Sequence, residues 1–495
     1  MKKREAKKLI QNIAGDCTIY QKSYRKKAGS HFFMARCGQD KFLFIVNRGE
    51  VYEQFRGEIF STGEVLLKKV VLDHDNGKVL RKVFPFTAPQ TVGRKKASLG
   101  LGDRLGVAAP GHIAAVEDRE VMPVLAQQSI RELELTGRSY LEVLDAASWG
   151  VFQRGFTGGF GADGDHLKSE AEINRALSAG YSMITLDGSE HIFDAASLDS
   201  KTRQKRYQKL RQQHQKLVDL EKEYAGNTFT VGEDFQVEFS REDWEIIALT
   251  YFKLLNFAEK IYNSMLKPKI QELDFELSID ETITPTSPQG HFFIGSQLFK
   301  RGLEITGLAP RFCGEFQKGI DYRGDRKQFA EEFELHARIA DYFGYKLSIH
   351  SGSDKFSVYP FIGKYTGGRV HVKTAGTSWL EAIWIIAEYE PVLFRQLYDF
   401  AREHFSEATR YYQVSTEAHQ VPSLQELSDQ QLPKLKKNEN VRQLLHITYG
   451  VLLQSKEDGK YLFRDRLYEF WNNHEQEYAA ALENHIGKHM DKLEG

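Results

Sequence analysis

The chain has 495 residues, with 67 Lys and Arg against 68 Asp and Glu and a formal net charge of −1. A near-neutral chain has no basic field for a phosphate backbone, which argues against nucleic acid as a partner. The length suffices for a large core and for about two to four domains. Its three cysteines, Cys17, Cys37 and Cys313, are too few for a disulfide framework or a cysteine zinc site.

The sequence also argues against a membrane protein. The basic start, Met1-Lys2-Lys3-Arg4, is not followed by the apolar stretch of a signal peptide. No segment approaches the length of a membrane span. We therefore expect a cytoplasmic protein without a membrane partner, and the sequence does not decide between a monomer and a homo-oligomer.

Residues 1–95 predict a small β-rich region. Residues 30–35 and 41–46 are short apolar runs, and breaks such as Asp75-Asn76-Gly77 are typical of hairpin turns. We find no candidate chemistry in this region. At the other end, residues 391–495 predict a C-terminal helical region without a site motif.

Residues 96–390 predict an α/β fold of the (β/α)8, TIM-barrel type. Short apolar runs alternate there with longer helical stretches. Polar or glycine-containing segments end the runs, as expected for a barrel whose active site lies at the C-terminal ends of its strands. These segments are Asp103-Arg104, 163–166, 185–190, Asp280-Glu281, Gln317, His350 and 373–377.

Two of these segments carry the clearest chemistry. In residues 161–168 and 349–355 an imidazole stands beside a carboxylate or a glycine-rich turn. A histidine with an adjacent acid can bind a metal while its neighbour moves a proton. The glycine-serine turn after His350 exposes backbone N–H groups that could hold an anion. Together the motifs predict a metal-dependent enzyme acting on a small, anionic, oxygen-rich substrate.

Several segments resemble the class II, metal-dependent aldolases in the same chain order. Where those aldolases supply a further histidine ligand, this chain has Gln317 or Glu315 instead. Asp354 replaces a glycine in the anion-binding turn, where its charge would disfavour a phosphate. The matching segments are Asp165-His166-Leu167-Lys168 and residues 183–190, 275–281, 350–354 and 371–379.

Taken as a whole, the chain resembles the tagaturonate epimerase family more closely. That resemblance implies a divalent metal and a hexuronate substrate, with interconversion of D-tagaturonate and D-fructuronate at C4 in hexuronate catabolism. It is carried by residues 102–106, Pro110-Gly111-His112, 161–168, 280–282, 285–288, 309–312, 350–359 and 372–379.

The implied reaction favours bond cleavage over direct deprotonation at C4. The ketone of tagaturonate is at C2, so the C4 hydrogen is not acidified by it. The C4 hydroxyl is β to the ketone, and cleaving C3–C4 leaves an enediolate that a metal can stabilise as a Lewis acid. Turning the aldehyde fragment before the bond re-forms inverts C4. We therefore expect a retro-aldol and aldol epimerisation.

The metal ligands that we predict are His166 and His350, with Gln317 third and Glu315 as its alternative. Imidazole and oxygen donors suit zinc, manganese, nickel or cobalt, and the sequence does not choose among them. Asp165, next to a ligand, is the predicted base for the C4 hydroxyl.

An acid from residues 276–281 should protonate and deprotonate the enediolate. Period-two alternation puts Glu276, Ser278 and Asp280 on one face of a strand. Glu281 follows at the C-terminal end of this strand, where a barrel places its catalytic groups. We favour Glu281, with Glu276 second. The candidates for binding the substrate carboxylate are Arg311, Lys318, Lys355 and Lys373.

Two other readings are open at this point. One is an aldolase that releases its three-carbon products, which the missing third histidine and Asp354 argue against. The other is a non-catalytic, aldolase-like helper subunit, although such a subunit need not keep Asp165, His166, Glu281 and His350 together.

Overall fold

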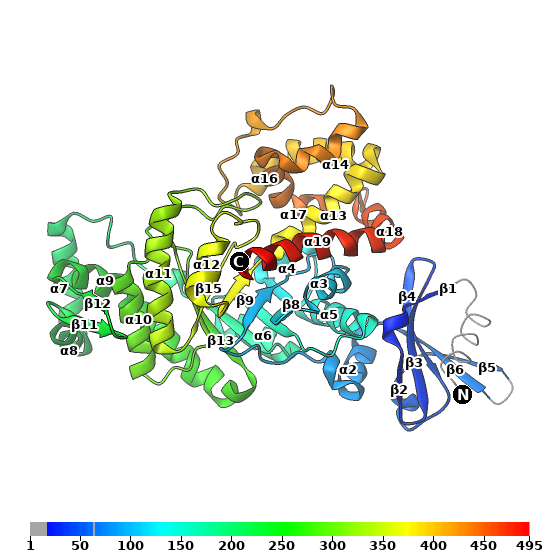
Figure 1. Ribbon diagram of the computed structural model, residues 1–495, viewed down its shortest axis with the longest axis horizontal. Helices are drawn as coiled ribbons and strands as arrows, with labels where there is room; N and C mark the ends of the chain where they lie inside the picture. The colour runs from blue at the N-terminus through cyan, green and yellow to red at the C-terminus, as the bar shows by residue number, and fades with distance from the viewer. Residues whose placement is uncertain (1–16, 63–64, 495) are drawn as a thin grey trace. The chain divides into compact units, whose positions relative to one another are not determined.

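The structure is a computed structural model that describes residues 17–62 and 65–494 (Figure 1). Its contacts divide the chain into two compact units that interleave along the sequence. The first unit comprises Met1–Gln90, Leu101–Ala162 and Ala375–Gly487, and the second Thr91–Gly100, Asp163–Thr374 and Lys488–Gly495. The predicted boundaries near residues 95 and 390 stay a prediction.

Eight strands close into a barrel in the order β10-β13-β14-β15-β16-β7-β8-β9, which confirms the predicted TIM-type α/β fold. Neighbouring pairs such as β10 with β13 and β15 with β16 run parallel. Residues of β10, β13 and β15 are buried at every position, as expected for parallel strands covered on both faces. The strands are β7 Ala97–Gly100, β8 Val121–Ser129, β9 Gly161–Leu167, β10 Met183–Asp187, β13 Asp274–Ile279, β14 Gly307–Pro310, β15 Lys346–Ile349 and β16 Val370–Lys373.

Helices separate these strands along the chain, and their ends follow local sequence signals. In α6, Ser169 and Glu172 form a capping box at the start and Gly180 adopts the left-handed conformation at the end. The helices are α3 Ala109–Val116, α4 Ile130–Thr136, α5 Tyr140–Arg154, α6 Glu170–Ala179, α9 Arg241–Ile261, α10 Pro288–Lys300, α11 Arg326–Phe343, α12 Tyr359–Thr366 and α13 Ala375–Tyr389. An excursion between β10 and α9 adds α7 Ser200–Gln213, α8 Gln215–Tyr224, β11 Thr228–Val231 and β12 Phe235–Glu238.

The N-terminal part of the first unit is an antiparallel sheet, as predicted. A disulfide between Cys17 and Cys37 joins β1 to β3, although the cysteine count alone did not point to one. The predicted turn at Asp75-Asn76-Gly77 is wrong, because these residues lie in helix α2, His74–Val83. The strands are β1 Cys17–Ile19, β2 Arg25–Lys27, β3 Ser30–Cys37, β4 Asp40–Val46, β5 Glu58–Thr62 and β6 Val65–Val71.

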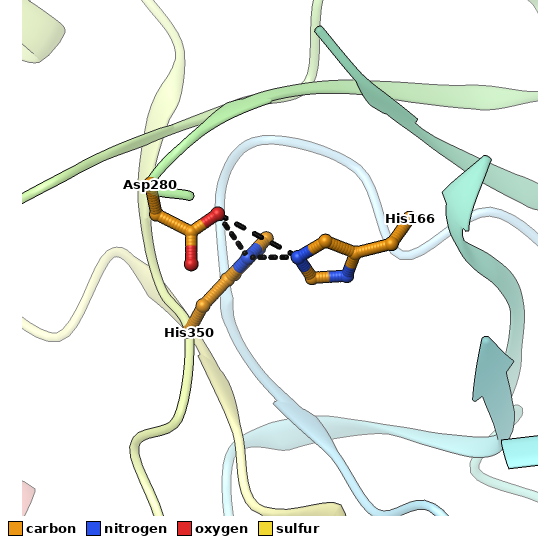
Figure 2. A group of neighbouring side chains, drawn as sticks. All are labelled: His166, Asp280 and His350. Atoms are coloured by element: carbon orange, nitrogen blue, oxygen red, sulfur yellow. Dashed lines mark hydrogen bonds and ion pairs between the residues drawn. The ribbon is translucent and has the colours of Figure 1, made fainter. Parts of the chain in front are cut away.

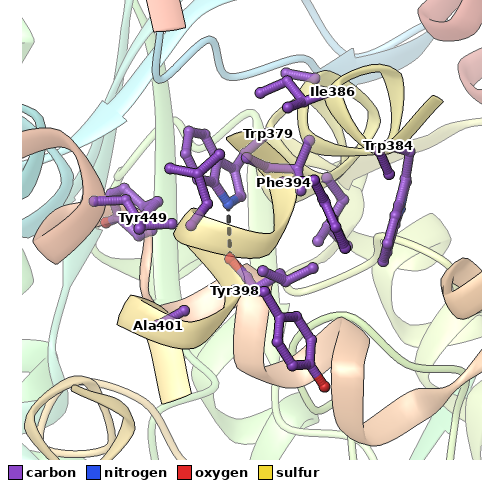
Figure 3. Close-up of a cluster of buried hydrophobic side chains, with 14 of the residues drawn as sticks. Trp379, Trp384, Ile386, Phe394, Tyr398, Ala401 and Tyr449 are labelled. Carbon is purple, nitrogen blue, oxygen red and sulfur yellow. Dashed lines mark hydrogen bonds between the residues drawn. The ribbon is translucent and has the colours of Figure 1, made fainter. Parts of the chain in front are cut away.

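The C-terminal region is helical, also as predicted. Its core gathers aromatic side chains around Trp379, whose indole N–H donates to the carbonyl of Leu445 over 2.7 Å (Figure 3). The elements are α14 Pro391–Glu403, α15 Phe405–Ala408, α16 Glu439–Ile447, α17 Tyr449–Gln454, β17 Lys456–Glu457, β18 Lys460–Tyr461, α18 Arg464–Asn473 and α19 Glu475–Glu494.

Within residues 17–62 and 65–494, no helix combines the length and the apolar character needed to cross a membrane.

Candidate functional site

The candidate site lies in the second unit, at the C-terminal ends of four barrel strands. His166 stands near the end of β9, Asp280 directly after β13, His350 directly after β15 and Lys373 at the end of β16. This is the end of a (β/α)8 barrel where strand termini deliver catalytic groups. Figure 2 shows the imidazoles of His166 and His350 and the carboxylate of Asp280 converging.

A bulge in β9 turns His166 toward this centre. Gly164 pairs with Ile184 and Leu167 with Leu186, so β9 advances three residues while β10 advances two. His166 takes up the extra residue with a positive φ of 53°, a conformation uncommon for a residue with a side chain. As a result consecutive side chains lie together, with His166 Nδ1 2.8 Å from Asp165 Oδ1.

Three potential ligand atoms meet at this point. His350 Nδ1 lies 3.2 Å from His166 Nε2 and 3.1 Å from Asp280 Oδ1, and His166 Nε2 lies 3.6 Å from the same oxygen. In a tetrahedral site with metal–ligand bonds of about 2.0–2.2 Å, the ligand atoms lie about 3.3–3.6 Å apart. The donor set of two imidazoles and one carboxylate therefore fits a divalent transition metal in both type and spacing.

The electrostatics of the cluster also favour added positive charge. Burial disfavours the charged form of His166, yet the adjoining Asp165 and Asp280 carboxylates raise its pKa well above the usual value. Burial likewise opposes ionisation of Asp280, but His350 and His166 hold the pKa of this carboxyl well below its usual range. The field that draws protons onto the imidazoles would equally attract a divalent cation.

Beneath the imidazoles lies a buried cluster of carboxylates around one ammonium group. Lys373 Nζ lies 3.0 Å from Asp163 Oδ2, 2.6 Å from Asp165 Oδ1 and 3.0 Å from Glu276 Oε1. It also donates to the hydroxyl of Thr185 over 2.8 Å. Burial disfavours the charged lysine, but the three acids raise its pKa well above normal. Lys373 is thus engaged by this chain's own acids, and its predicted role in substrate binding stays a prediction.

Further charged side chains lie close to His166, and some of them are exposed to solvent. Glu281, the favoured acid, is exposed, and its carboxylate belongs to a group with His166 and Asp187 whose ligand atoms lie within 4.8 Å of one another. Lys168 Nζ lies 3.4 Å from Asp187 Oδ2 and 3.9 Å from Glu281 Oε2. The second acid candidate, Glu276, is fully buried.

The other predicted carboxylate-binding residues differ in their surroundings. Lys318 is half-buried, and its ammonium donates to the hydroxyl of Ser351, next to His350, over 2.9 Å. Lys355 is fully buried and donates to the carbonyls of Gln317, Ile320 and Ser353. Arg311 donates to the carbonyl of Thr282.

The third metal ligand stays a prediction, and the structure brings a different side chain from the expected one next to the two imidazoles. The oxygen beside the imidazoles belongs to Asp280, whereas the side-chain amide of Gln317 contacts Glu315. The alternation that grouped Glu276, Ser278 and Asp280 on one strand face was the signal available for it. Asp163 and Thr185 were also missed, because a buried partner of Lys373 has no sequence signature of its own.

Comparisons with known proteins identify the family of this chain. The model of the tagaturonate epimerase family matches residues 20–493. A tagaturonate/fructuronate epimerase of Thermotoga maritima is 40% identical over 489 residues, covering 96% of this chain and 97% of that protein. Two crystal structures of fructuronate-tagaturonate epimerase UxaE from Cohnella laeviribosi, one native and one with glycerol, superpose with a TM-score of 0.94 at 46% identity, covering 99% of both chains. The chain therefore belongs to the tagaturonate epimerase family.

Proposed function

We propose that the protein interconverts D-tagaturonate and D-fructuronate by inverting C4, with one divalent metal ion held by His166, Asp280 and His350. The observation that carries this proposal is the convergence of two imidazole nitrogens and a carboxylate oxygen within 3.1–3.6 Å at the end of the barrel. Membership of the tagaturonate epimerase family supports the substrate pair. A cytoplasmic location is the setting we expect for such a catabolic reaction.

The metal would supply Lewis acidity toward the oxygens of the substrate, and zinc, manganese, nickel and cobalt all suit the donor set. Asp280 takes the place of Gln317 in this assignment because its Oδ1 lies 3.1 Å from His350 Nδ1.

The bond changes balance without an oxidant or a reductant. Removal of the C4 hydroxyl proton turns C4 into an aldehyde as the C3–C4 bond breaks, and the bonding pair passes to C3 and the C2 ketone. The fragments are the enediolate of dihydroxyacetone and tartronate semialdehyde. After the aldehyde has turned its other face, the same pair re-forms C3–C4, and the C4 oxygen recovers its proton.

Among the predicted acid–base residues, Glu281 is the best placed to move this proton. Its side chain is 41% exposed, and Lys168 lies 3.9 Å from its Oε2. We therefore propose that Glu281 exchanges a proton with the C4 hydroxyl, the role expected of Asp165 from the sequence, instead of with the enediolate. The predictions that Asp165 and Glu276 act as base and acid stay untested, and their carboxylates contact imidazoles (Asp165 to His166, Glu276 to His350).

Lys318 is our candidate for the carboxylate of the substrate. Its contact with Ser351 brings a cation next to His350, and it is half-buried, whereas Lys355 is enclosed by carbonyls. An ammonium group binds a carboxylate as a point charge with up to three donors.

The test is to add Mn²⁺, Ni²⁺, Co²⁺ or Zn²⁺ in turn to metal-free protein with D-tagaturonate and to follow the products by NMR. We expect fructuronate to form only with metal and without free three-carbon products. The matched control is His350→Ala, which should stay inactive with every metal. Free tartronate semialdehyde would indicate an aldolase instead, and absence of any reaction would contradict the proposal.

A further inference from the structure

We propose that Glu276 and Asp165 are positioning residues that lock the imidazoles of His350 and His166 in the orientation that aims His350 Nδ1 and His166 Nε2 at one point. This inference rests on the proposed metal site. It adds a role for two carboxylates that are not themselves among the proposed metal ligands. It also makes Lys373 the link that couples the two imidazoles.

The contact between Glu276 and His350 uses the ring nitrogen that faces away from the ligand cluster. Glu276 Oε1 lies 2.7 Å from His350 Nε2, while His350 Nδ1 faces His166 and Asp280. A carboxylate can only accept, so the contact with Glu276 requires a hydrogen on Nε2. Once the proton on Nδ1, beside Asp280, is displaced, Nδ1 holds the free lone pair of the ring. Glu276 is 0% exposed and the His350 side chain is 3% exposed, so water does not compete for this contact.

Asp165 contacts His166 in an equivalent way, but through Nδ1 and not Nε2. Asp165 Oδ1 lies 2.8 Å from His166 Nδ1, which leaves Nε2 toward His350 and Asp280. Rotating either imidazole by half a turn would replace its inward nitrogen with a carbon. Each carboxylate therefore selects one of two ring orientations that packing alone would tolerate.

Lys373 ties the two carboxylates to each other. Its Nζ lies 2.6 Å from Asp165 Oδ1 and 3.0 Å from Glu276 Oε1, the same oxygens that contact the imidazoles. Thr185 adds a hydroxyl that contacts Glu276 Oε1 over 3.3 Å. The positions of both acceptor oxygens are thus fixed by residues of four strands, β9, β10, β13 and β16, before any ligand arrives.

A metal-binding histidine commonly donates its other N–H to a carboxylate, and loss of that partner lowers metal affinity by about 10- to 100-fold. Asp163 provides the matched comparison. It is also fully buried and also lies 3.0 Å from Lys373 Nζ, but its contacts are with Lys373 and Thr185 and not with an imidazole. Burial raises the pKa of Asp163 to about 6, so its charged form is less favoured than that of an ordinary aspartate.

The experiment titrates metal-free wild type, Glu276→Gln, Asp165→Asn and Asp163→Asn with Co²⁺ and follows its visible absorption bands. Circular dichroism and thermal unfolding of the metal-free proteins check that each variant folds. We expect the Glu276 and Asp165 variants to bind Co²⁺ at least about tenfold more weakly, and Asp163→Asn to bind like wild type. If one of the first two variants does not fold, the other still tests the inference.

The outcomes separate this inference from the proposed function. Equal affinities in all four proteins would overturn the positioning role while leaving the metal site intact. An equal loss in all three variants would also overturn it, because removal of buried charge alone would then suffice. A wild type that binds no Co²⁺ would instead refute the metal site itself.

Discussion

At the end of β16, the ammonium group of Lys373 lies among the buried carboxylates of Asp163, Asp165 and Glu276. These acids come from strands far away in the sequence; Asp165 is separated from Lys373 by 208 positions. A buried ion cluster adds little stability over an apolar core, but removing one sign from it leaves uncompensated charge. The stability of the site therefore depends on Lys373 more than on any single acid.

We expect Lys373→Met to lower the free energy of unfolding by about 3–5 kcal/mol, because the remaining carboxylates stay buried without their cation. Urea unfolding of the metal-free protein measures this effect. Adding Asp163→Asn to the variant should recover part of the loss, since it removes one of the stranded charges. A Lys373→Met protein as stable as wild type would show that water reaches these acids.

Lys318 tests how the substrate is recognised. Lys318→Met should lower kcat/KM for tagaturonate by about 10- to 100-fold, since a hydrogen bond to a charged group contributes about 1.5–3 kcal/mol. The matched substrate is the neutral ketohexose with a hydroxymethyl group in place of the carboxylate, whose kcat/KM should hardly change. An equal loss for both substrates would assign Lys318 to the loop of Ser351 and not to the carboxylate.

Residues of the site could be predicted from the sequence where the signal is local. His166 and His350 stand beside acids or glycines at strand ends, and this pattern pointed to the two imidazoles that the structure brings together. Asp280 was not predicted as a ligand candidate. Alternation indicates which residues share a strand face, but it does not indicate which carboxylate on that face lies beside the imidazoles. The burial of Lys355 and Lys373 depends on carbonyls and acids of distant segments, which no spacing along the chain reveals.

Among the elements, β9 and α2 show where periodicity fails. Alternation along β9 would separate Asp165 from His166, but the bulge and the positive φ of His166 bring them together. Residues 75–77, whose types are typical of a turn, lie in the first turn of helix α2. Asp73 caps this helix by accepting a hydrogen bond from the N–H of Asn76. A capping residue two positions upstream thus outweighed the hairpin signal.

Helices α10 and α11 meet through two buried histidines. His291 Nδ1 lies 2.9 Å from His336 Nδ1, and His291 Nε2 contacts the hydroxyl of Tyr345 over 2.9 Å. Burial lowers the pKa of His336 to about 4. In the unfolded chain a histidine has a pKa of about 6.5, so between these values the unfolded state holds more protons. Stability due to His336 is therefore lost as the pH falls below about 6.5.

When the pH is lowered from 7.5 to 5, the titration of His336 should lower the free energy of unfolding of the wild type by about 2 kcal/mol. His336→Gln, which does not titrate, should be less stable at pH 7.5 but should lose correspondingly less over the same pH range. Urea unfolding of both proteins at the two pH values measures the difference. Parallel pH dependences would contradict a depressed pKa for His336.

In the molecule as a whole, the barrel was the most predictable feature. Polar residues after successive apolar runs reflect the geometry of a (β/α)8 barrel, in which every strand delivers its end to one rim. The interleaving of the two units was not predictable, because residues 375–487 belong with 101–162 through tertiary contacts. In one such contact, the guanidinium carbon of Arg104 lies 3.9 Å from the centroid of the Tyr449 ring. Such contacts leave no periodic signal in the sequence.

The most direct test of C4 inversion by cleavage of C3–C4 is to run the metal-loaded reaction in D₂O and examine fructuronate by NMR. Bond cleavage and re-formation never remove the hydrogen on C4, so we expect fructuronate with protium at C4 and no deuterium there. Incorporation of deuterium at C4 during inversion would contradict the proposed chemistry and require direct deprotonation of that carbon.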